Sequence, residues 1–176
     1  MRRLRYGVAM SMDGFIAGPN GEYDWIVSDP AIDFAATFAQ YDTFLMGRAT
    51  YEVASEKGKS WDLHGQRWIV VARTLKPEDH PGITILSSGI AEAVAALKAQ
   101  PGKDIWLFGG GVLFRSMLDA GLVDTVEVAL MPVMLGSGVP LLPAGRRRRL
   151  QLRESKPLPS GILMLVYSVV PEAQAA

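Results

Sequence analysis

The sequence contains no cysteine and only two histidines. The lack of cysteine excludes disulfide bonds and thiolate metal ligands. His64 and His80 are sixteen positions apart in loop-like sequence, a spacing that is not typical of a metal site. We therefore expect no bound metal.

An excess of charge is also missing. The 18 lysines and arginines balance 18 aspartates and glutamates, so the formal net charge is zero. The chain thus lacks the basic excess typical of nucleic-acid-binding proteins, and we expect no nucleic-acid partner. The run Arg146–Arg149 could meet a polyanion, but a polar strand follows it from Leu150, which favours a solvated loop that guards a sheet edge.

No apolar stretch approaches the roughly 18–20 residues that cross a membrane. The basic start Met1–Arg5 is followed too early by Asp13 and Gly14 for a signal peptide. These absences predict a cytoplasmic protein without a membrane partner. The length of 176 residues favours one domain, 1–176, with a loose tail at 172–176.

Strand-like and helix-like segments alternate through the first 120 residues, and nearly all later segments are strand-like. The expected strands are Leu4–Met10, Phe15–Ala17, Thr43–Gly47, Arg67–Ala72, Ile83–Leu86, Asp104–Phe108, Val123–Met131, Leu150–Arg153 and Gly161–Val170. The expected helices run from an Asp29 N-cap with Pro30 to Ala39, onward from Arg48, over Ile90–Ala99, and from the glycines at 109–111 to Gly121. This order predicts an α/β fold. It is a three-layer α/β/α arrangement around a mixed sheet, mostly parallel, with a C-terminal antiparallel hairpin.

Three glycines stand directly between a strand and a helix. The strand ends at Phe108, Gly109–Gly111 follow, and the helix starts near Val112. Such a junction exposes backbone N–H groups at a helix N-terminus, where the helix dipole favours a phosphate. A glycine-lined tight turn without a ligand is the alternative.

Two further junctions have the same order of elements. Gly47 leads into Arg48 and Thr50, and Ala72 leads into Arg73. Ligands of open α/β sheets bind beyond the carboxyl ends of the strands, so these side chains are expected to gather there. Arginine binds phosphate in a bidentate manner, which points to a ligand with several phosphates, such as a dinucleotide. Solvated loop arginines are the alternative.

Four blocks of sequence together resemble a known family. They are Val8–Ala17 (VAMSMDGFIA), Leu45–Glu52 (LMGRATYE), Phe108–Gly111 (FGGG) and Pro132–Leu141 (PVMLGSGVPL). In this order and spacing they resemble the dihydrofolate reductase superfamily. The last block is most similar to the reductase domain of the bifunctional riboflavin-biosynthesis deaminase-reductase and to its stand-alone relatives. The resemblance extends over about residues 4–170.

The resemblance implies an NADPH-binding reductase with a dihydrofolate reductase-like fold. Position by position, it implies that Ala9, Ile16 and Ala17 line the nicotinamide pocket. It implies phosphate contacts from Arg48 and Thr50, a second contact to the adenosine 2′-phosphate from Arg73, and a passage beneath the pyrophosphate at Gly109, Gly110 and Gly111. The flanking residues of these junctions complete the expected cofactor site; they are Gly47, Phe108 and Val112.

The acidic residue that binds the pterin ring in dihydrofolate reductases has no direct counterpart. Counting back from Gly47 puts Ala31 at that position, with Asp29 and Asp33 two residues to either side. A two-residue shift turns a helical side chain by about 200°, which argues against dihydrofolate as the substrate. Asp33, or failing that Asp29, is the candidate catalytic residue that orients the substrate or relays a proton. The expected substrate contacts are Trp25, Phe34, Phe38 and Met46.

These expectations combine into NADPH-dependent reduction of a C=N or C=O bond in a small, flat, heterocyclic substrate. Reduction of a pyrimidine, as in riboflavin biosynthesis, is one form of it. The sequence shows no counterpart of the deaminase domain, so we do not expect it to be the whole bifunctional enzyme. The alternative is a non-catalytic nucleotide-binding protein that keeps the fold. By analogy with the riboflavin-type relatives we expect a homodimer.

Overall fold

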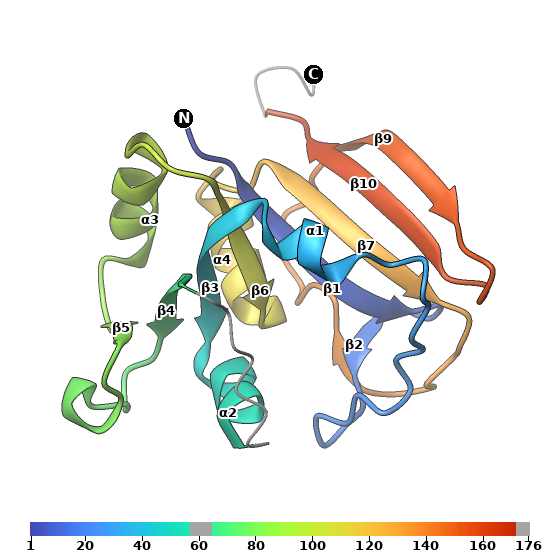
Figure 1. Ribbon diagram of the computed structural model, residues 1–176, viewed down its shortest axis with the longest axis horizontal. Helices are drawn as coiled ribbons and strands as arrows, with labels where there is room; N and C mark the ends of the chain where they lie inside the picture. Colours follow the sequence, from blue (N-terminus) through green and yellow to red (C-terminus); the bar gives the residue numbers. More distant parts are fainter. Residues whose placement is uncertain (57–64, 172–176) are drawn as a thin grey trace.

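The computed structural model describes residues 1–56 and 65–171. Its centre is an eight-stranded sheet in the order β5-β4-β3-β6-β1-β7-β10-β9 (Figure 1). The strands are β1 (Leu4–Ser11), β3 (Tyr41–Gly47), β4 (Arg67–Val71), β5 (Ile83–Leu86), β6 (Asp104–Gly109), β7 (Thr125–Met131), β9 (Leu150–Pro157) and β10 (Leu163–Val169). Neighbours from β5 to β7 are parallel, whereas β10 is antiparallel to β7 and β9. The predicted mixed sheet with a C-terminal antiparallel hairpin is confirmed.

Helices cover both faces of this sheet. The short α1 (Phe34–Phe38) and α2 (Arg48–Glu56) pack on one face, and α3 (Ile90–Ala99) and α4 (Gly111–Asp119) pack on the other. Successive residues of β3 point to opposite faces of the sheet. Phe44 packs in the core beneath α1 and α2, and Leu45 packs in the core beneath α3 and α4. This arrangement is the expected three-layer α/β/α architecture.

A second, two-stranded sheet lies beside the main one. It pairs β2 (Phe15–Ala17) with β8 (Val139–Pro140), far apart in sequence. The close approach of the two segments requires glycine at Gly138, because an added Cβ would lie 2.2 Å from the Ala17 carbonyl oxygen. The pairing therefore holds the block after β7 against the turn after β1.

The first helix differs from the sequence-based expectation. A helix from Asp29 to Ala39 was expected, but α1 has only five residues and starts after Asp33, whose carboxylate accepts from the Ala36 N–H at 2.8 Å. Asp33, not Asp29, is thus the N-cap, and the helix starts four residues later than expected. The predicted loose tail, 172–176, and His64 lie outside the described residues. None of the helices in the described ranges is long and apolar enough to cross a membrane.

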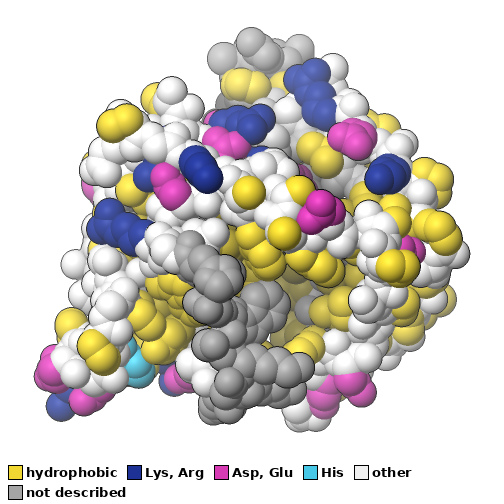
Figure 2. Space-filling view, viewed as in Figure 1, with side chains coloured by type: hydrophobic (Ala, Val, Ile, Leu, Met, Phe, Trp, Pro, Cys, Tyr) yellow, Lys and Arg dark blue, Asp and Glu magenta, His cyan; other side chains and the backbone are white. Residues whose placement is uncertain are grey.

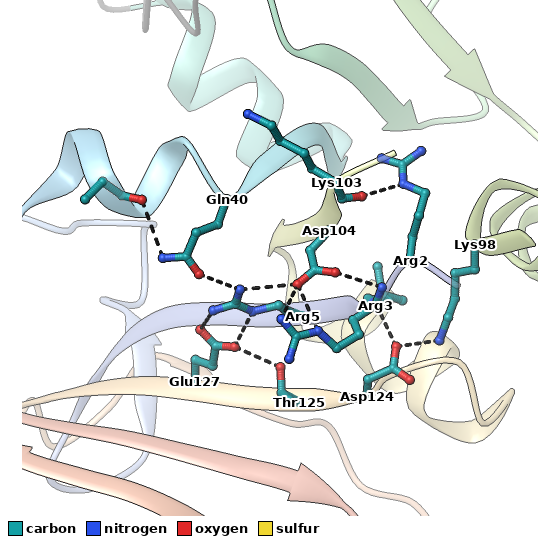
Figure 3. A network of polar contacts seen from close by, with 12 residues as sticks. Arg2, Arg3, Arg5, Gln40, Lys98, Lys103, Asp104, Asp124, Thr125 and Glu127 are labelled. Carbon is teal, nitrogen blue, oxygen red and sulfur yellow. Dashed lines mark hydrogen bonds and ion pairs between the residues drawn. The ribbon is translucent and has the colours of Figure 1, made fainter. Parts of the chain in front are cut away.

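The amino ends of the central strands carry a network of ion pairs (Figure 3). Arg5 binds Glu127 through two hydrogen bonds of 2.6 and 2.8 Å, and Arg3 donates twice to Asp104. Lys98 pairs with Asp124. Burial alone would raise the pKa of Asp104, but the hydrogen bonds from Arg3 outweigh it and lower that pKa. At this edge the charges join strand to strand.

Candidate functional site

The carboxyl ends of the parallel strands meet at the opposite edge of the sheet. The β3–β4 register pairs Gly47 with Val71, and the β3–β6 register pairs Met46 with Gly109. The three strand ends are therefore neighbours, but only β3 and β6 lead into α-helices. Arg73 lies instead in a loop that leads to a 3-10 turn at Pro77–Asp79. The structure brings together the residues that follow β4, β3 and β6, as the sequence argument anticipated.

Thr50 lies directly against the glycine turn. A Cβ added to Gly109 would be 3.0 Å from the Thr50 Cγ2 and Oγ1 atoms, so only glycine leaves the two junctions this close. Gly110 has φ +92°, a conformation that side chains rarely adopt, and no side chain caps the helix α4 that it starts. The turn therefore presents an uncapped helix N-terminus beside a hydroxyl group.

Gly111 has a different requirement from its neighbours. It is buried, and an added Cβ would lie 2.9 Å from the Pro140 carbonyl oxygen. Its lack of a side chain is explained by packing of α4 against the segment after β8. Val112, in contrast, is 77% exposed at the first turn of the helix.

Both candidate arginines are exposed at this edge. Arg48 begins α2 and forms an i,i+4 ion pair with Glu52 at 3.1 Å. Arg73 lies two residues beyond β4 and is likewise exposed. A pair between exposed side chains contributes little to stability, so Arg48 remains able to bind an anion.

The expected nicotinamide end lies around β1 and β2. Ala9, Ile16 and Ala17 are half-buried, and Ala9 packs against the cluster of Met131, Leu158 and Ile162. Trp25 packs against the same cluster and donates its indole N–H to the Glu22 carbonyl at 3.0 Å. The structure thus brings one expected cofactor contact and one expected substrate contact to a common apolar base.

Asp13 fastens the turn after β1 to the block after β7. Its carboxylate accepts from the Ser11 hydroxyl at 2.6 Å and from the backbone N–H groups of Leu135 and Gly136 at 3.1 and 2.7 Å. The hydrogen bond from Ser11, followed by that from Gly136, lowers the pKa of Asp13 to about 2. The carboxylate therefore stays ionised and has a structural role.

Aromatic side chains form the wall on the α1 side. Phe34 is 52% exposed and stacks on Phe38, and Phe38 in turn contacts Trp106 with a centroid distance of 5.4 Å. Figure 2 shows hydrophobic side chains gathered around a hollow on this face. Phe108 continues the wall next to Trp106.

Met46 was expected to contact the substrate, but it is fully buried in the core. In β3, Met46 points to the same face of the sheet as Phe44, and both side chains belong to one core cluster. Trp106, which the sequence reading did not single out, donates its indole N–H to the Gly7 carbonyl at 3.1 Å. The signal for it was available, because Trp106 alternates with Phe108 on one side of the same strand.

The two candidate catalytic carboxylates are both engaged with backbone groups. Asp33 caps α1 and is exposed. Asp29 is only 3% exposed and accepts from the N–H groups of Ala31 and Ser160 at 2.7 and 3.0 Å. The nearby Ser160 hydroxyl, together with these N–H groups, lowers the pKa of Asp29. An ionised, fully engaged carboxylate anchors the hairpin turn and is a poor proton donor.

The described residues hold no group of three or more His, Asp or Glu side chains that could bind a metal ion. The arrangement at this edge suits binding of phosphates by N–H groups and arginines, beside an apolar and aromatic hollow.

The sequence model of the RibD C-terminal domain matches residues 2–164. YyaP, an uncharacterized protein of Bacillus subtilis (strain 168), is 35% identical over an alignment of 178 positions that covers 94% of each chain. Among solved structures, a protein of Shewanella sp. PV-4 whose name assigns it to riboflavin biosynthesis has a TM-score of 0.82 at 22% identity, covering 97% of this chain and 100% of that one.

The dihydrofolate reductase of Enterococcus faecalis, solved with NADP(H), has a TM-score of 0.73 at 18% identity, covering 96% of this chain and 97% of that one. At these identities the solved structures show the fold, which is dihydrofolate reductase-like. The fold and the sequence blocks agree.

Proposed function

Because the chain belongs to the RibD C-terminal domain family, we propose that it is a reductase that binds NADPH along the carboxyl edge of the sheet. Its substrate would be a small, flat heterocycle. The observation that carries the proposal is the contact of Thr50 with the glycine turn. This contact brings the start of α2 and the start of α4 together, so that both could bind the phosphates of one ligand.

The order of the junctions matches the order of groups in a dinucleotide. From β4 through β3 and β6 to β1 there are three strand spacings, about 14 Å in all. An extended dinucleotide can lie along such an edge, with adenosine near β4 and nicotinamide near β1. A dinucleotide that runs in one direction along the edge, from Arg73 to Ala9, would therefore contact every junction.

The phosphates would be held at the middle and the β4 end of this edge. The uncapped N-terminus of α4 at Gly110 and the Thr50 hydroxyl suit the pyrophosphate. Arg48 and Arg73, both exposed, suit the adenosine 2′-phosphate. These two arginines would select NADPH over NADH.

The nicotinamide end would be shaped by small side chains. Ala9 and Ala17 leave room for a flat ring, and the block fastened by Asp13 holds β2 in place through its pairing with β8. When bound, NADPH supplies a hydride. Trp25 and Phe34 would then bind the acceptor ring by stacking and by excluding water.

Proton delivery is expected to come from solvent. Asp29 is ionised and engaged, and Asp33 uses its carboxylate as a helix cap. The same engagement is the specific observation in favour of a second candidate, a nucleotide-binding protein without catalysis. The two candidates differ only in whether hydride leaves the cofactor.

The test begins with titration of NADPH and NADH, followed by fluorescence transfer from tryptophan to the reduced nicotinamide. The proposal expects NADPH to bind at least tenfold more tightly than NADH. Equal affinities would remove the 2′-phosphate role of both arginines, and no binding of either would refute the cofactor site.

Oxidation of bound NADPH is then followed with dihydrofolate, with a ribosylaminopyrimidine phosphate and with unphosphorylated pterins and pyrimidines as acceptors. Turnover of one class names the substrate. Tight NADPH binding without oxidation by any of them would favour the non-catalytic candidate.

A further inference from the structure

A cavity lies on the other face of the sheet, between α4 and residues 141–150. Its volume is about 420 Å³, at the small end of the range of about 300–1,000 Å³ for small-molecule pockets. Its lining includes Phe114 and Leu118 of α4, Val126 of β7 and, from the covering segment, Leu141 and Leu142. The interior is therefore apolar.

The segment that covers the cavity is held in place by one buried arginine. Arg115 binds Asp119 through two hydrogen bonds of 2.8 and 2.7 Å and donates to the Arg146 carbonyl at 2.9 Å. Gly145 lies so close that an added Cβ would be 2.2 Å from the Arg115 guanidinium carbon. Arg148 adds a hydrogen bond of 3.3 Å to the Asp119 carbonyl. Four contacts thus build the cavity wall.

The charge around the cavity is of one sign. Among the described residues, four arginines and no aspartate or glutamate line it: Arg115, Arg146, Arg147 and Arg148. The nearby Asp119 is already engaged by Arg115. Arg146 and Arg147 are exposed, and the apolar Leu150 is still 43% exposed beside them.

We propose that this cavity binds a small amphipathic anion, with an apolar body about the size of one ring and a short chain, and one carboxylate or similar oxyanion. The body would fill the space above Phe114 and Val126, and the oxyanion would meet Arg146 and Arg147. The complementarity is direct, because an apolar interior with a cationic rim excludes cations and gives polar neutral molecules few partners. The lining residues Leu141 and Pro143 also lie against Gly111, but the proposal does not depend on the proposed cofactor site.

The probe is 4-phenylbutyrate, with 4-phenylbutanol as the neutral match of the same size. Each is titrated into the full chain, and binding is read from the backbone amide shifts in NMR spectra. We expect 4-phenylbutyrate to saturate with a Kd of about 1 mM, and shifts confined to α4, β7 and residues 141–150. 4-Phenylbutanol should bind at least tenfold more weakly.

Two double variants separate the rim from general surface charge. R146Q/R147Q should weaken 4-phenylbutyrate about tenfold and leave 4-phenylbutanol unchanged, because charge-assisted contacts are lost. R67Q/R153Q removes the same charge from exposed sites on β4 and β9 and should change the affinity less than twofold. R146K/R147K should retain most of the binding.

A third variant tests the apolar interior. Leu150→Trp places a larger ring at the cavity rim and should abolish binding of both compounds, while the fold is checked by the amide spectrum. Equal binding of acid and alcohol, equal losses in the two arginine-to-glutamine variants, or shifts centred on Arg48, Thr50 and Arg73 would each overturn the proposal. Binding of a short RNA through Arg146 and Arg147, without 4-phenylbutyrate binding, would also overturn it.

Discussion

At the amino ends of β1, β6 and β7, arginine and lysine side chains form ion pairs with carboxylates. At the carboxyl ends of β3 and β4, in contrast, Arg48 and Arg73 are exposed. Arg5 and Glu127 have only 12% and 19% of their side-chain surface exposed, but Arg48 and its partner Glu52 have 55% and 40%. The first pair exchanges two hydrogen bonds and the second only one. The difference shows that one edge uses charge to join strands and the other keeps charge available to a ligand.

Glycine also has different surroundings at the two edges. The carboxyl edge has Gly47 with open space around its α-carbon, Gly109 against Thr50, and Gly110 with positive φ. Gly109 and Gly110 leave the start of α4 without a capping side chain. At the amino edge, Gly102 lies instead against the ion-paired side chains of Arg2 and Asp42.

The largest expected effect is a loss of stability when an ion pair of the amino edge is removed. Glu127→Ala leaves the largely buried Arg5 without its main partner, and it should lower the free energy of unfolding by about 3 kcal/mol. Urea unfolding measures the change. NADPH affinity should stay the same.

The matched control is Glu154→Ala on β9, where the glutamate is exposed. It should change stability by less than about 0.5 kcal/mol. If Glu127→Ala were as mild as this control, the amino-edge network would not have the structural role given to it here.

The converse effect is expected for Arg48→Ala. It should weaken NADPH by about 2 kcal/mol, about 30-fold, because a charge-assisted phosphate contact is lost, and it should leave NADH binding unchanged. Unfolding stability should change by less than about 0.5 kcal/mol, since the Arg48–Glu52 pair is exposed. Fluorescence titration and urea unfolding measure the two quantities.

Glu52→Ala serves as the control for Arg48→Ala. It removes the same surface ion pair but no phosphate contact, so NADPH should bind at least as tightly as to the original chain. A loss equal to that of Arg48→Ala would mean that the ion pair itself positions α2.

A smaller change is expected at the contact between the junctions. Thr50→Val keeps the shape against Gly109 but removes the hydroxyl, and it should weaken both NADPH and NADH by about 1 kcal/mol. Both cofactors share the pyrophosphate, so an effect on NADPH alone would argue against the assigned subsite. Thr84→Val on β5, away from the junctions, is the control and should change neither affinity.

The smallest effect concerns Asp13, a carboxylate of the carboxyl edge that accepts several hydrogen bonds, as the carboxylates of the amino edge do. Asp13 has a pKa of about 2 in the folded chain, below its ordinary value of 3.8. Its stabilisation is therefore present above about pH 4 and is lost as the pH falls through about 2. Asp13→Asn should lower stability slightly at pH 7, and the difference from the original chain should vanish below pH 2.

Urea unfolding at a series of pH values measures this difference. The control is Asp24→Asn at an exposed aspartate, which should change stability at pH 7 by less than about 0.5 kcal/mol. A difference for Asp13→Asn that is constant with pH would contradict the role of the ionised carboxylate.

Much of the fold follows from local sequence patterns. Ile83–Leu86 and Ile90–Ala99 have the predicted bounds, because a short apolar run and an i, i+4, i+7 spacing each fix one type of element. Gly121 has the positive φ, +69°, expected of the residue after a helix. The helix after Asp29 was predicted too long, because two aspartates offer N-caps and the sequence does not say which one is used.

The site was only partly accessible to such patterns. The three junctions could be recognised, since each is a strand end followed by glycine or arginine. The use of Asp29 and Asp33 could not, because Asp29 meets Ser160 across 131 positions of the chain. The burial of Met46 was also missed, since a strand covered on both faces is apolar throughout and gives no sign of which side a residue faces.

The sequence by itself determined the elements, the alternation of strands and helices, and the residues at each junction, because these depend on contacts between near neighbours. Only the tertiary structure decided that β3 lies between β4 and β6, so that Thr50 touches Gly109 and the phosphate-type junctions form one edge. It also decided which carboxylates are engaged and where an arginine-rimmed cavity forms. Those outcomes depend on contacts between residues distant in the chain, which no local periodicity encodes.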